Sequence, residues 1–465
     1  AGPSSLGPLA RDDVVQVQPQ LRGRPVCGLT PADFPYTYEV LSAKQNFDHV
    51  FTVVVEDDEG LTDISDPAEM TVLVPETGAQ KCIYPDELNP DVLAVSSWIS
   101  GVVYADDAIV AVGTRDVGDG PRLTVWKFDR DGCGVLPGWP IPVGSWTKRA
   151  DVKTSMSGGT AVAVDEEGNI VVGGFSLVNL EPRRYIAMLS STGSRVWEEI
   201  GQVGEEIAGV AVAPKPKAAV FAVGWRRSGL DPKPTDAMIW HHMPDDGTPS
   251  PPDILAAPFT PDEPNPDEKN EYSEWARAVV IEPSTGYAFV VGEREYRDNN
   301  FQLPTRTFAV RYNALTGVVG DPWTSPGSSF FHDSADAVVV CGHQFLAAGW
   351  RRDDAPNALP APLIQWFTAD GSPAGLRSLP LTPVHLRGIA CDREGKLVGA
   401  GTRDGVLKDV QVFAVIDDAL VWYDQGSAGD DEAVAVSCDR RGFCAWGGYR
   451  TKDGKRYAVV RAHHP

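Results

Sequence analysis

The sequence predicts an all-β protein: a seven-bladed β-propeller preceded by a small immunoglobulin-like β-sandwich segment. A sevenfold internal repeat of short apolar runs is the main observation behind this prediction. Composition is the second, because 46 glycines and 38 prolines among 465 residues suit many short strands joined by turns. A chain of this length has room for two domains. We assign residues 1–86 to the sandwich segment with a flexible N-terminal tail, and residues 87–465 to the propeller.

Each repeat begins with a small residue and a β-branched residue, and it ends 12 to 14 residues later with a glycine. The small residues are Gly101, Ala161, Ala211, Ala278, Ala337, Gly388 and Ala435. The closing glycines are Gly113, Gly174, Gly224, Gly292, Gly349, Gly401 and Gly448. The spacing predicts four short strands, a to d, in each blade, with strand a lining the central channel. Small residues would let the inner strands crowd the axis, and the glycine predicts a bend or a close backbone approach at the end of strand b.

The seventh repeat stops after its third strand, at the C-terminus of the chain. An uncovered strand edge favours aggregation, so the ring should be closed by another segment. We expect the short apolar segment 91–95 to supply the missing outer strand of the last blade.

The N-terminal segment contains two runs of alternating polar and apolar residues, 49–55 and 68–74, around an acidic turn. This pair resembles the last two strands of cadherin-like or PKD-type immunoglobulin-like domains, and the resemblance implies a β-sandwich. Asp57, Asp58 and Asp63 offer the oxygen ligands that calcium prefers, although a solvated acidic turn also explains them. No other cofactor is expected.

The propeller repeats resemble bacterial secreted β-propeller repeats of the SBBP type, most closely at Asp165–Gly174, and PQQ-type repeats at Ser191–Trp197. The resemblance implies a propeller fold and export from a bacterial cell, to the cell surface, the extracellular space or the periplasm. Seven cysteines are present, and we expect two disulfides, Cys27–Cys82 and Cys438–Cys444. The second pair flanks a predicted hairpin turn.

Several classes of function are disfavoured by the sequence. A formal net charge of −23 argues against a nucleic-acid partner, since phosphate recognition needs a basic face. No apolar run reaches the ~18 residues of a membrane span. Nucleophile-elbow, zinc-protease and P-loop motifs are missing, so we expect a protein that is not an enzyme.

A repeated arginine is the clearest candidate for function. Two positions after the closing glycines stand Arg115, Ser176, Arg226, Arg294, Arg351, Arg403 and Arg450. One interpretation is an anion-binding rim, because arginine recognises carboxylates bidentately. The other is structural, with each arginine paired to an acid on a neighbouring blade.

Long predicted loops in repeats three to five, and Gly-Trp-Arg-Arg at 224–227 and 349–352, direct attention to one patch. Its members are Trp225, Arg226, Arg227, Arg294, Tyr296, Arg297, Trp350, Arg351 and Arg352. We expect a surface scaffold or adhesin that binds a protein or glycan at the cell surface through this patch. The alternatives are a structural subunit that self-assembles through the N-terminal segment, a propeller-fold polysaccharide hydrolase or lyase, and, less favoured, a quinone-dependent dehydrogenase.

Overall fold

A computed structural model shows two compact units, residues 1–74 and 75–465. The structure describes strands within residues 47–72, residues 80–84, and residues 95–463 apart from the connections 106–107, 119, 131–133, 144–155, 179–180, 215–218, 228–234, 244–245, 250–252, 255–272, 283, 296–304, 315–316, 326–330, 354–358, 379–383, 393–394, 404–408, 417–418, 425–430, 440–441 and 453. The larger unit is a seven-bladed β-propeller, as the repeat predicts.

Each blade is a four-stranded antiparallel sheet, and in the first six blades the strands follow chain order from a to d. The first four blades are β6–β9 (Ser97–Tyr104, Ala108–Asp116, Pro121–Asp129, Ile141–Pro142), β10–β13 (Ser157–Val164, Ile170–Val178, Glu181–Leu189, Arg195–Val203), β14–β17 (Glu205–Val212, Val220–Arg227, Thr235–His242, Asp253–Ile254) and β18–β21 (Glu274–Ile281, Ala288–Glu295, Thr305–Asn313, Gly317–Thr324). The next two are β22–β25 (Phe331–Cys341, Gln344–Asp353, Ala361–Phe367, Pro373–Ser378) and β26–β29 (Val384–Cys391, Leu397–Arg403, Asp409–Ile416, Ala419–Asp424). The seventh contains β30–β32 (Glu432–Cys438, Cys444–Lys452, Lys455–His463).

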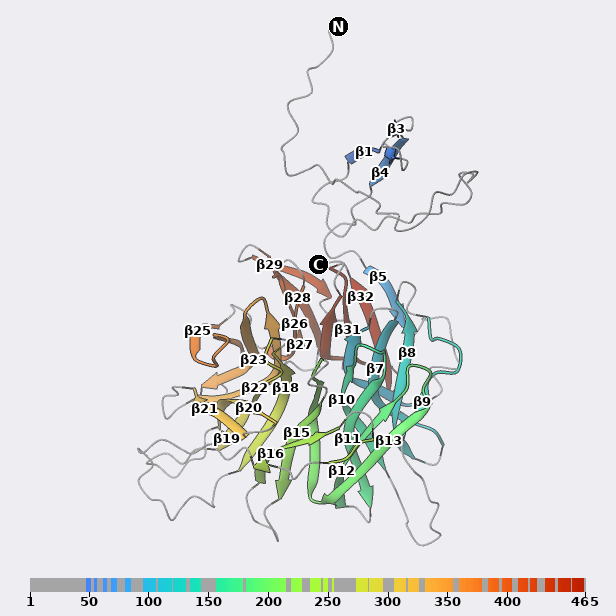
Figure 1. Ribbon diagram of the computed structural model, residues 1–465. Coiled ribbons are helices and arrows are strands. Elements are labelled where there is room, and N and C mark those ends of the chain that lie inside the picture. The colour runs from blue at the N-terminus through green and yellow to red at the C-terminus, as the bar shows by residue number, and fades with distance from the viewer. Residues whose placement is uncertain are drawn as a thin grey trace. The chain divides into compact units, whose positions relative to one another are not determined.

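The a strands contact one another in sequence around a closed ring, from β6 through β30 and back to β6 (Figure 1). The last blade is completed three-plus-one, as predicted, but by a different segment. β5 (Gln80–Tyr84) pairs antiparallel with β32, through Val460↔Tyr84 and Ala462↔Cys82. The outer position is therefore filled by residues 80–84 rather than 91–95, and the propeller begins before the boundary predicted at residue 87. Residues 91–94 lie outside the described residues.

The repeated glycine has a steric origin in strand a. In every blade the pairing of strands a and b shifts by one residue at a β-bulge, for example between Ala335 and Ala337. The bulge turns a carbonyl oxygen toward the closing glycine, so a Cβ on Gly349 would lie 1.8 Å from the Ser334 oxygen. The other six closing glycines meet the equivalent oxygen at 1.8 to 2.2 Å. The glycine therefore marks a close backbone approach within strand b, which continues for two to four residues beyond it.

Small residues just after the bulge let neighbouring a strands approach. A Cβ on Gly101 would lie 3.3 Å from Ala161 Cα of the next blade, and one on Gly388 would lie 3.0 Å from Ala435 Cα. In the third blade the bulge falls between Ile207 and Gly209, and Gly209 faces Ala278 at 3.1 Å. Gly209 is therefore the equivalent residue, and the assignment to Ala211 is two residues too late.

The hydrophobic core is divided among the blade junctions. Seven clusters of buried residues are found in the described part of the chain, and each combines side chains of two adjacent blades. At the junction of blades four and five, for instance, Phe289 and Phe345 stack with ring centroids 4.3 Å apart. Blade packing therefore closes the ring without a single central core.

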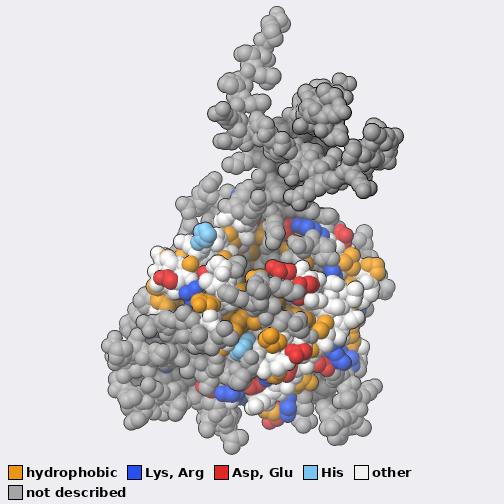
Figure 2. All heavy atoms as spheres, in the orientation of Figure 1, with side chains coloured by type: hydrophobic (Ala, Val, Ile, Leu, Met, Phe, Trp, Pro, Cys, Tyr) orange, Lys and Arg blue, Asp and Glu red, His pale blue; other side chains and the backbone are white. Residues whose placement is uncertain are grey.

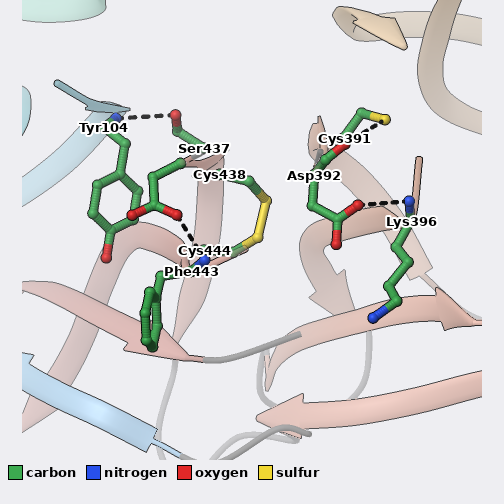
Figure 3. Close-up of a disulfide and its surroundings, with 9 residues drawn as sticks. Tyr104, Cys391, Asp392, Lys396, Ser437, Cys438, Phe443 and Cys444 are labelled. Atoms are coloured by element: carbon green, nitrogen blue, oxygen red, sulfur yellow. Dashed lines mark hydrogen bonds between the residues drawn. A yellow bond between two sulfur atoms is a disulfide. The ribbon is translucent and has the colours of Figure 1, made fainter. Parts of the chain in front are cut away.

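Two disulfides join strand ends at the a–b turns. Cys438–Cys444 bridges β30 and β31, which confirms that prediction (Figure 3). Cys341–Cys391, which the sequence analysis missed, links the ends of β22 and β26 and so joins blades five and six. The turns that follow Cys391 and Cys438 contain the same kind of hydrogen bond. In each turn an aspartate carboxylate accepts from the backbone N–H four residues later: Asp392 from Lys396 and Asp439 from Phe443, both at 2.8 Å. Cys27 lies outside the described residues, so its pairing stays a prediction.

The N-terminal unit contains two short antiparallel pairs. β1 (Phe47–Phe51) pairs with β4 (Ala68–Val72), and β2 (Val54–Glu56) pairs with β3 (Thr62–Ile64). The two alternating runs therefore do pair, whereas an immunoglobulin-like sandwich stays a prediction. The side chains of the acidic residues proposed for calcium lie outside the described part.

Candidate functional site

The predicted patch lies at one end of the propeller, which we call the loop face. Each strand b ends opposite the beginning of strand a of the same blade, as in the pair Arg351↔Asp333. The b–c connection and the incoming d–a connection therefore meet at this end of every blade. Three of these connections, residues 228–234, 255–272 and 296–304, surround blades three and four in the sequence and lie outside the described residues.

Three of the six repeated arginines form ion pairs within their own blade. Arg294 pairs with Glu274 at 3.2 Å, Arg351 with Asp333 at 3.0 Å, and Arg450 with Asp431 at 3.5 Å. The acid lies on strand a of the same blade or immediately before it, not on a neighbouring blade as the structural interpretation expected. Arg294 is only 5% exposed, so its guanidinium is not part of a binding surface.

The position opposite the repeated arginine also contacts the preceding blade. It lies four residues before the small residue that follows the bulge in strand a. The residues at this position are all buried: Ser97, Ser157, Glu205, Glu274, Asp333, Val384 and Asp431. Ala458 N–H donates to Ser97 Oγ at 3.1 Å and Leu123 N–H to Ser157 Oγ at 2.9 Å.

Asp333, with no exposed surface, is the most highly connected member of this set. It accepts from Thr307 N–H at 2.6 Å, from Ser325 Oγ at 2.9 Å and from Arg351. Through Asp333, Arg351 is therefore connected to the preceding blade as well as to its own.

Other members of the patch are accessible. Arg227 and Arg352 are exposed, and Trp225 and Trp350 are half-buried. Arg226 is half-buried beside Asp236, whose pKa is raised by burial and lowered to a smaller extent by this arginine. Tyr296 and Arg297 lie outside the described residues.

Both tryptophans contact the next blade. Trp225 lies under the Arg277 guanidinium, 5.5 Å from the ring centroid, and Trp350 lies 5.0 Å from the His385 ring. The structure therefore places the two Gly-Trp-Arg-Arg sequences on equivalent strands of blades three and five, separated by blade four.

A collar of aromatic rings near the channel was missed by the sequence analysis. The residue three before the small residue of strand a pairs with the residue after the closing glycine of strand b. In every blade except the sixth, one member of this pair is Trp, Phe or Tyr. In the sixth blade the ring is the imidazole of His385. The other six residues are Trp98, Phe175, Trp225, Trp275, Trp350 and Tyr449. The aromatic residue lies on strand a in some blades and on strand b in others, so no fixed spacing reveals it until the strand register is known.

Charged side chains stand beside this collar in blades three to seven. Arg277 donates through Nε to Glu293 Oε1 at 3.1 Å, and Arg387 lies 3.0 Å from Asp336 and 3.9 Å from Glu432. Glu206 makes no hydrogen bond or ion pair within the described residues, and burial raises its pKa against the opposing effect of Arg227 and Arg277. Figure 2 likewise shows acidic, basic and apolar side chains interspersed on the viewed face.

These features define a β-propeller with a polar and aromatic loop face. Its fold is similar to that of the Pan2 WD40 domain of Neurospora crassa, with 10% identity, 83% of this chain and 95% of that chain covered, and a TM-score of 0.50. A protein of unknown function from Dyadobacter fermentans (9% identity, 79% and 94% covered, TM-score 0.45) and Sqt1 from Chaetomium thermophilum (12%, 84% and 90%, TM-score 0.43) are also similar. At these identities the likeness shows the fold alone.

No protein-family model and no curated protein sequence matches the chain. The resemblance to SBBP-type and PQQ-type repeats therefore stays a prediction. Within the described residues, no helix is long and apolar enough to cross a membrane. No group of three or more His, Cys, Asp or Glu side chains in that part of the chain could hold a metal ion.

Proposed function

We propose that the chain is an exported, non-catalytic interaction scaffold that binds a partner at its loop face, between blades three and five. The observation that carries the proposal is the pair of half-buried tryptophans, each followed within two residues by an exposed arginine, Arg227 or Arg352. Trp and Arg are the residues most enriched at interface hot spots. A rigid ring that presents such residues beside long connections is a usual arrangement for binding.

A further exposed apolar side chain supports this location. Leu359 is 57% exposed just before β24, on the b–c connection of blade five. It therefore lies at the same end of the same blade as Arg352. Isolated exposed leucines are common, but one beside Trp and Arg adds apolar area to a surface that already suits an interface.

The two disulfides support export. The described part of the propeller contains two disulfides, Cys341–Cys391 and Cys438–Cys444, and each joins the ends of two strands. The blades also pack through apolar clusters, so the disulfides add to a fold that already has a core. Disulfides persist in oxidising compartments and are rare in the cytosol of most organisms. This reasoning agrees with the bacterial secreted repeats that the sequence resembles.

The test uses arginines that the fold does not need. Arg351 anchors the buried Asp333, so its removal would confound binding with unfolding. Arg227→Ala and Arg352→Ala change exposed residues instead. The purified full chain and each variant would be immobilised and incubated with cell-surface extract, and the retained material quantified.

We expect either variant to reduce retention several-fold with an unchanged melting temperature. Arg195→Ala, at an exposed position on the outer strand β13, is the matched control and should retain the partner normally. Equal retention by all three variants would exclude the loop face as the binding surface.

A further inference from the structure

Glu206 differs from the other acids around the collar in its contacts. Glu432, at the equivalent position of blade seven, lies 3.9 Å from Arg387, and Glu293 accepts from Arg277. Glu206 is half-buried and makes no hydrogen bond or ion pair to any residue that the structure describes. A carboxylate that has lost water without gaining a donor is free to accept hydrogen bonds from a ligand.

An aromatic surface and a donor lie beside this carboxylate. Trp225 stands directly across from Glu206 in the strand pair, and its indole is half-buried. Arg277 of the next blade lies over the same indole. Its Nε and Nη2 both donate to Glu293, its Nη1 has no partner among the described residues, and its side chain is 33% exposed.

The charges at this site are balanced. Glu206 and Glu293 contribute two negative charges, while Arg277 and Arg227 contribute two positive ones. A cationic ligand that approached Glu206 would meet the two arginines, and an anionic ligand that approached Arg277 would meet the two glutamates. A neutral ligand that both donates and accepts hydrogen bonds avoids both penalties.

The connection that leads from blade two to Glu206 is short. β13 passes to β14 through Gly204 alone, which has a φ of +82° and whose carbonyl accepts from Arg227 N–H at 3.0 Å. The link is followed immediately by Glu205 and Glu206. No long connection therefore enters this blade ahead of Glu206.

We propose that Glu206, Trp225 and Arg277 form a binding site for a neutral carbohydrate, the terminal or internal sugar of a glycan. The sugar hydroxyls would donate to the Glu206 carboxylate and accept from Arg277 Nη1. The C–H face of the pyranose ring would pack on the exposed part of the Trp225 indole, which offers an apolar body beside polar groups. This inference rests on the proposed function and names the class of partner for it.

The experiment is a binding screen with the full chain. Labelled protein would be applied to a printed array of neutral hexose and N-acetylhexosamine oligosaccharides together with sialylated and uronic-acid oligosaccharides. The neutral oligosaccharide with the strongest signal would then be titrated by calorimetry into the wild type, Glu206→Gln and Trp225→Leu. Glu432→Gln and Trp98→Leu, changes of the same kind at collar positions of blades seven and one, are the controls.

We expect a neutral oligosaccharide to bind, with a loss of about tenfold or more in affinity for Glu206→Gln and Trp225→Leu. The controls should change affinity less than about twofold, and all four variants should melt with the wild type. Absence of neutral oligosaccharide binding, preference for acidic oligosaccharides, or unchanged affinity in both site variants would overturn the proposal. Failure of the sugar site together with Arg227-dependent retention of a protein from surface extract would leave the scaffold function intact.

Discussion

The closing glycines offer the sharpest test of how the sequence repeat produces the ring. A Cβ on Gly349 would lie 1.8 Å from the Ser334 carbonyl oxygen, 2.8 Å from its carbonyl carbon and 2.9 Å from Ala335 Cα. Contacts below 3.0 Å are essentially never adopted by real Cβ atoms, so β22 and β23 must separate by at least 3.0 − 1.8 = 1.2 Å in Gly349→Ala. All three atoms belong to the backbone, so no side chain can move aside to relieve the contact.

That separation would disrupt the adjacent ladder hydrogen bonds. A bond near 2.9 Å that lengthens by over 1 Å is lost, and each buried unpaired group costs about 1–3 kcal/mol. Loss of about two such bonds lowers the free energy of unfolding by about 2–6 kcal/mol. An unfolding entropy of about 2.1 cal/mol/K per residue amounts to about 0.8 kcal/mol/K for the unit 75–465, so we expect the melting temperature to fall by about 2–7 °C.

Gly375→Ala in the same blade is the matched control. Gly375 lies in the outer strand β25, and its Cβ would meet nothing within 4 Å. Because alanine is favoured over glycine in a strand, this variant should be neutral or more stable by about 0.5–1 kcal/mol. Both variants would be compared with the wild type by calorimetry and chemical denaturation. If Gly349→Ala melted within about 1 °C of Gly375→Ala, the bulge carbonyl would not be the reason for the repeat.

Three further perturbations test the junctions between blades. Asp333→Ala should lower the free energy of unfolding, measured in urea, by about 3–5 kcal/mol, because Arg351 and the Thr307 N–H lose a buried acceptor. Ser97→Ala removes one neutral acceptor and should lower it by about 1 kcal/mol. Equal effects of the two variants would contradict this ranking. His242, 1% exposed and 3.2 Å from Glu199, has a pKa lowered chiefly by burial, so the unfolded chain takes up a proton more readily below about pH 6.5. Stability should therefore fall from pH 6.5 downward by at most ~1.4 kcal/mol per pH unit until the native residue is also protonated, and a pH series should show a shallower slope for His242→Phe. A disulfide stabilises the fold by restricting the unfolded chain, and the effect grows with the length of the closed loop. Cys341→Ala/Cys391→Ala opens a loop of 50 residues and should lower stability by about 4 kcal/mol, whereas Cys438→Ala/Cys444→Ala, with a separation of 6, should lower it by about 2 kcal/mol. The reverse order in urea denaturation would refute this chain-entropy argument.

The sequence predicted the ring well because the ring imposes the same steric condition seven times. Gly113 and Gly349 are far apart in the chain, yet both face a carbonyl oxygen turned inward by a bulge. The a and c strands followed from apolar runs of fixed length between turns. Strand d is harder to locate from the sequence, because β9 and β17 have only two residues each.

Errors arose where several short segments satisfied the same pattern. Gly209 and Ala211 are both small residues before a valine, and only the bulge between Ile207 and Gly209 distinguishes them. Segments 80–84 and 91–95 are likewise both short and partly apolar, and strand pairing selects the first. The Cys341–Cys391 bridge, by contrast, could have been predicted. Its separation of 50 residues nearly equals the 51 residues between Ala337 and Gly388, so both cysteines fall at the ends of adjacent a strands.

The candidate site was less predictable because repetition itself points to structure. An arginine that recurs in six blades is most simply explained by a condition that every blade must meet, and three of the six pair with a strand a acid of their own blade. Binding to one partner needs no sevenfold repetition, so its residues should be found where one blade departs from the others. Glu206 is such a residue, since blades one, two and four to six have Trp98, Gly158, Trp275, Ser334 and His385 at its position, and in blade seven Glu432 is paired. Once the register is known, deviation from the repeat is a better guide to function in this propeller than the repeat itself.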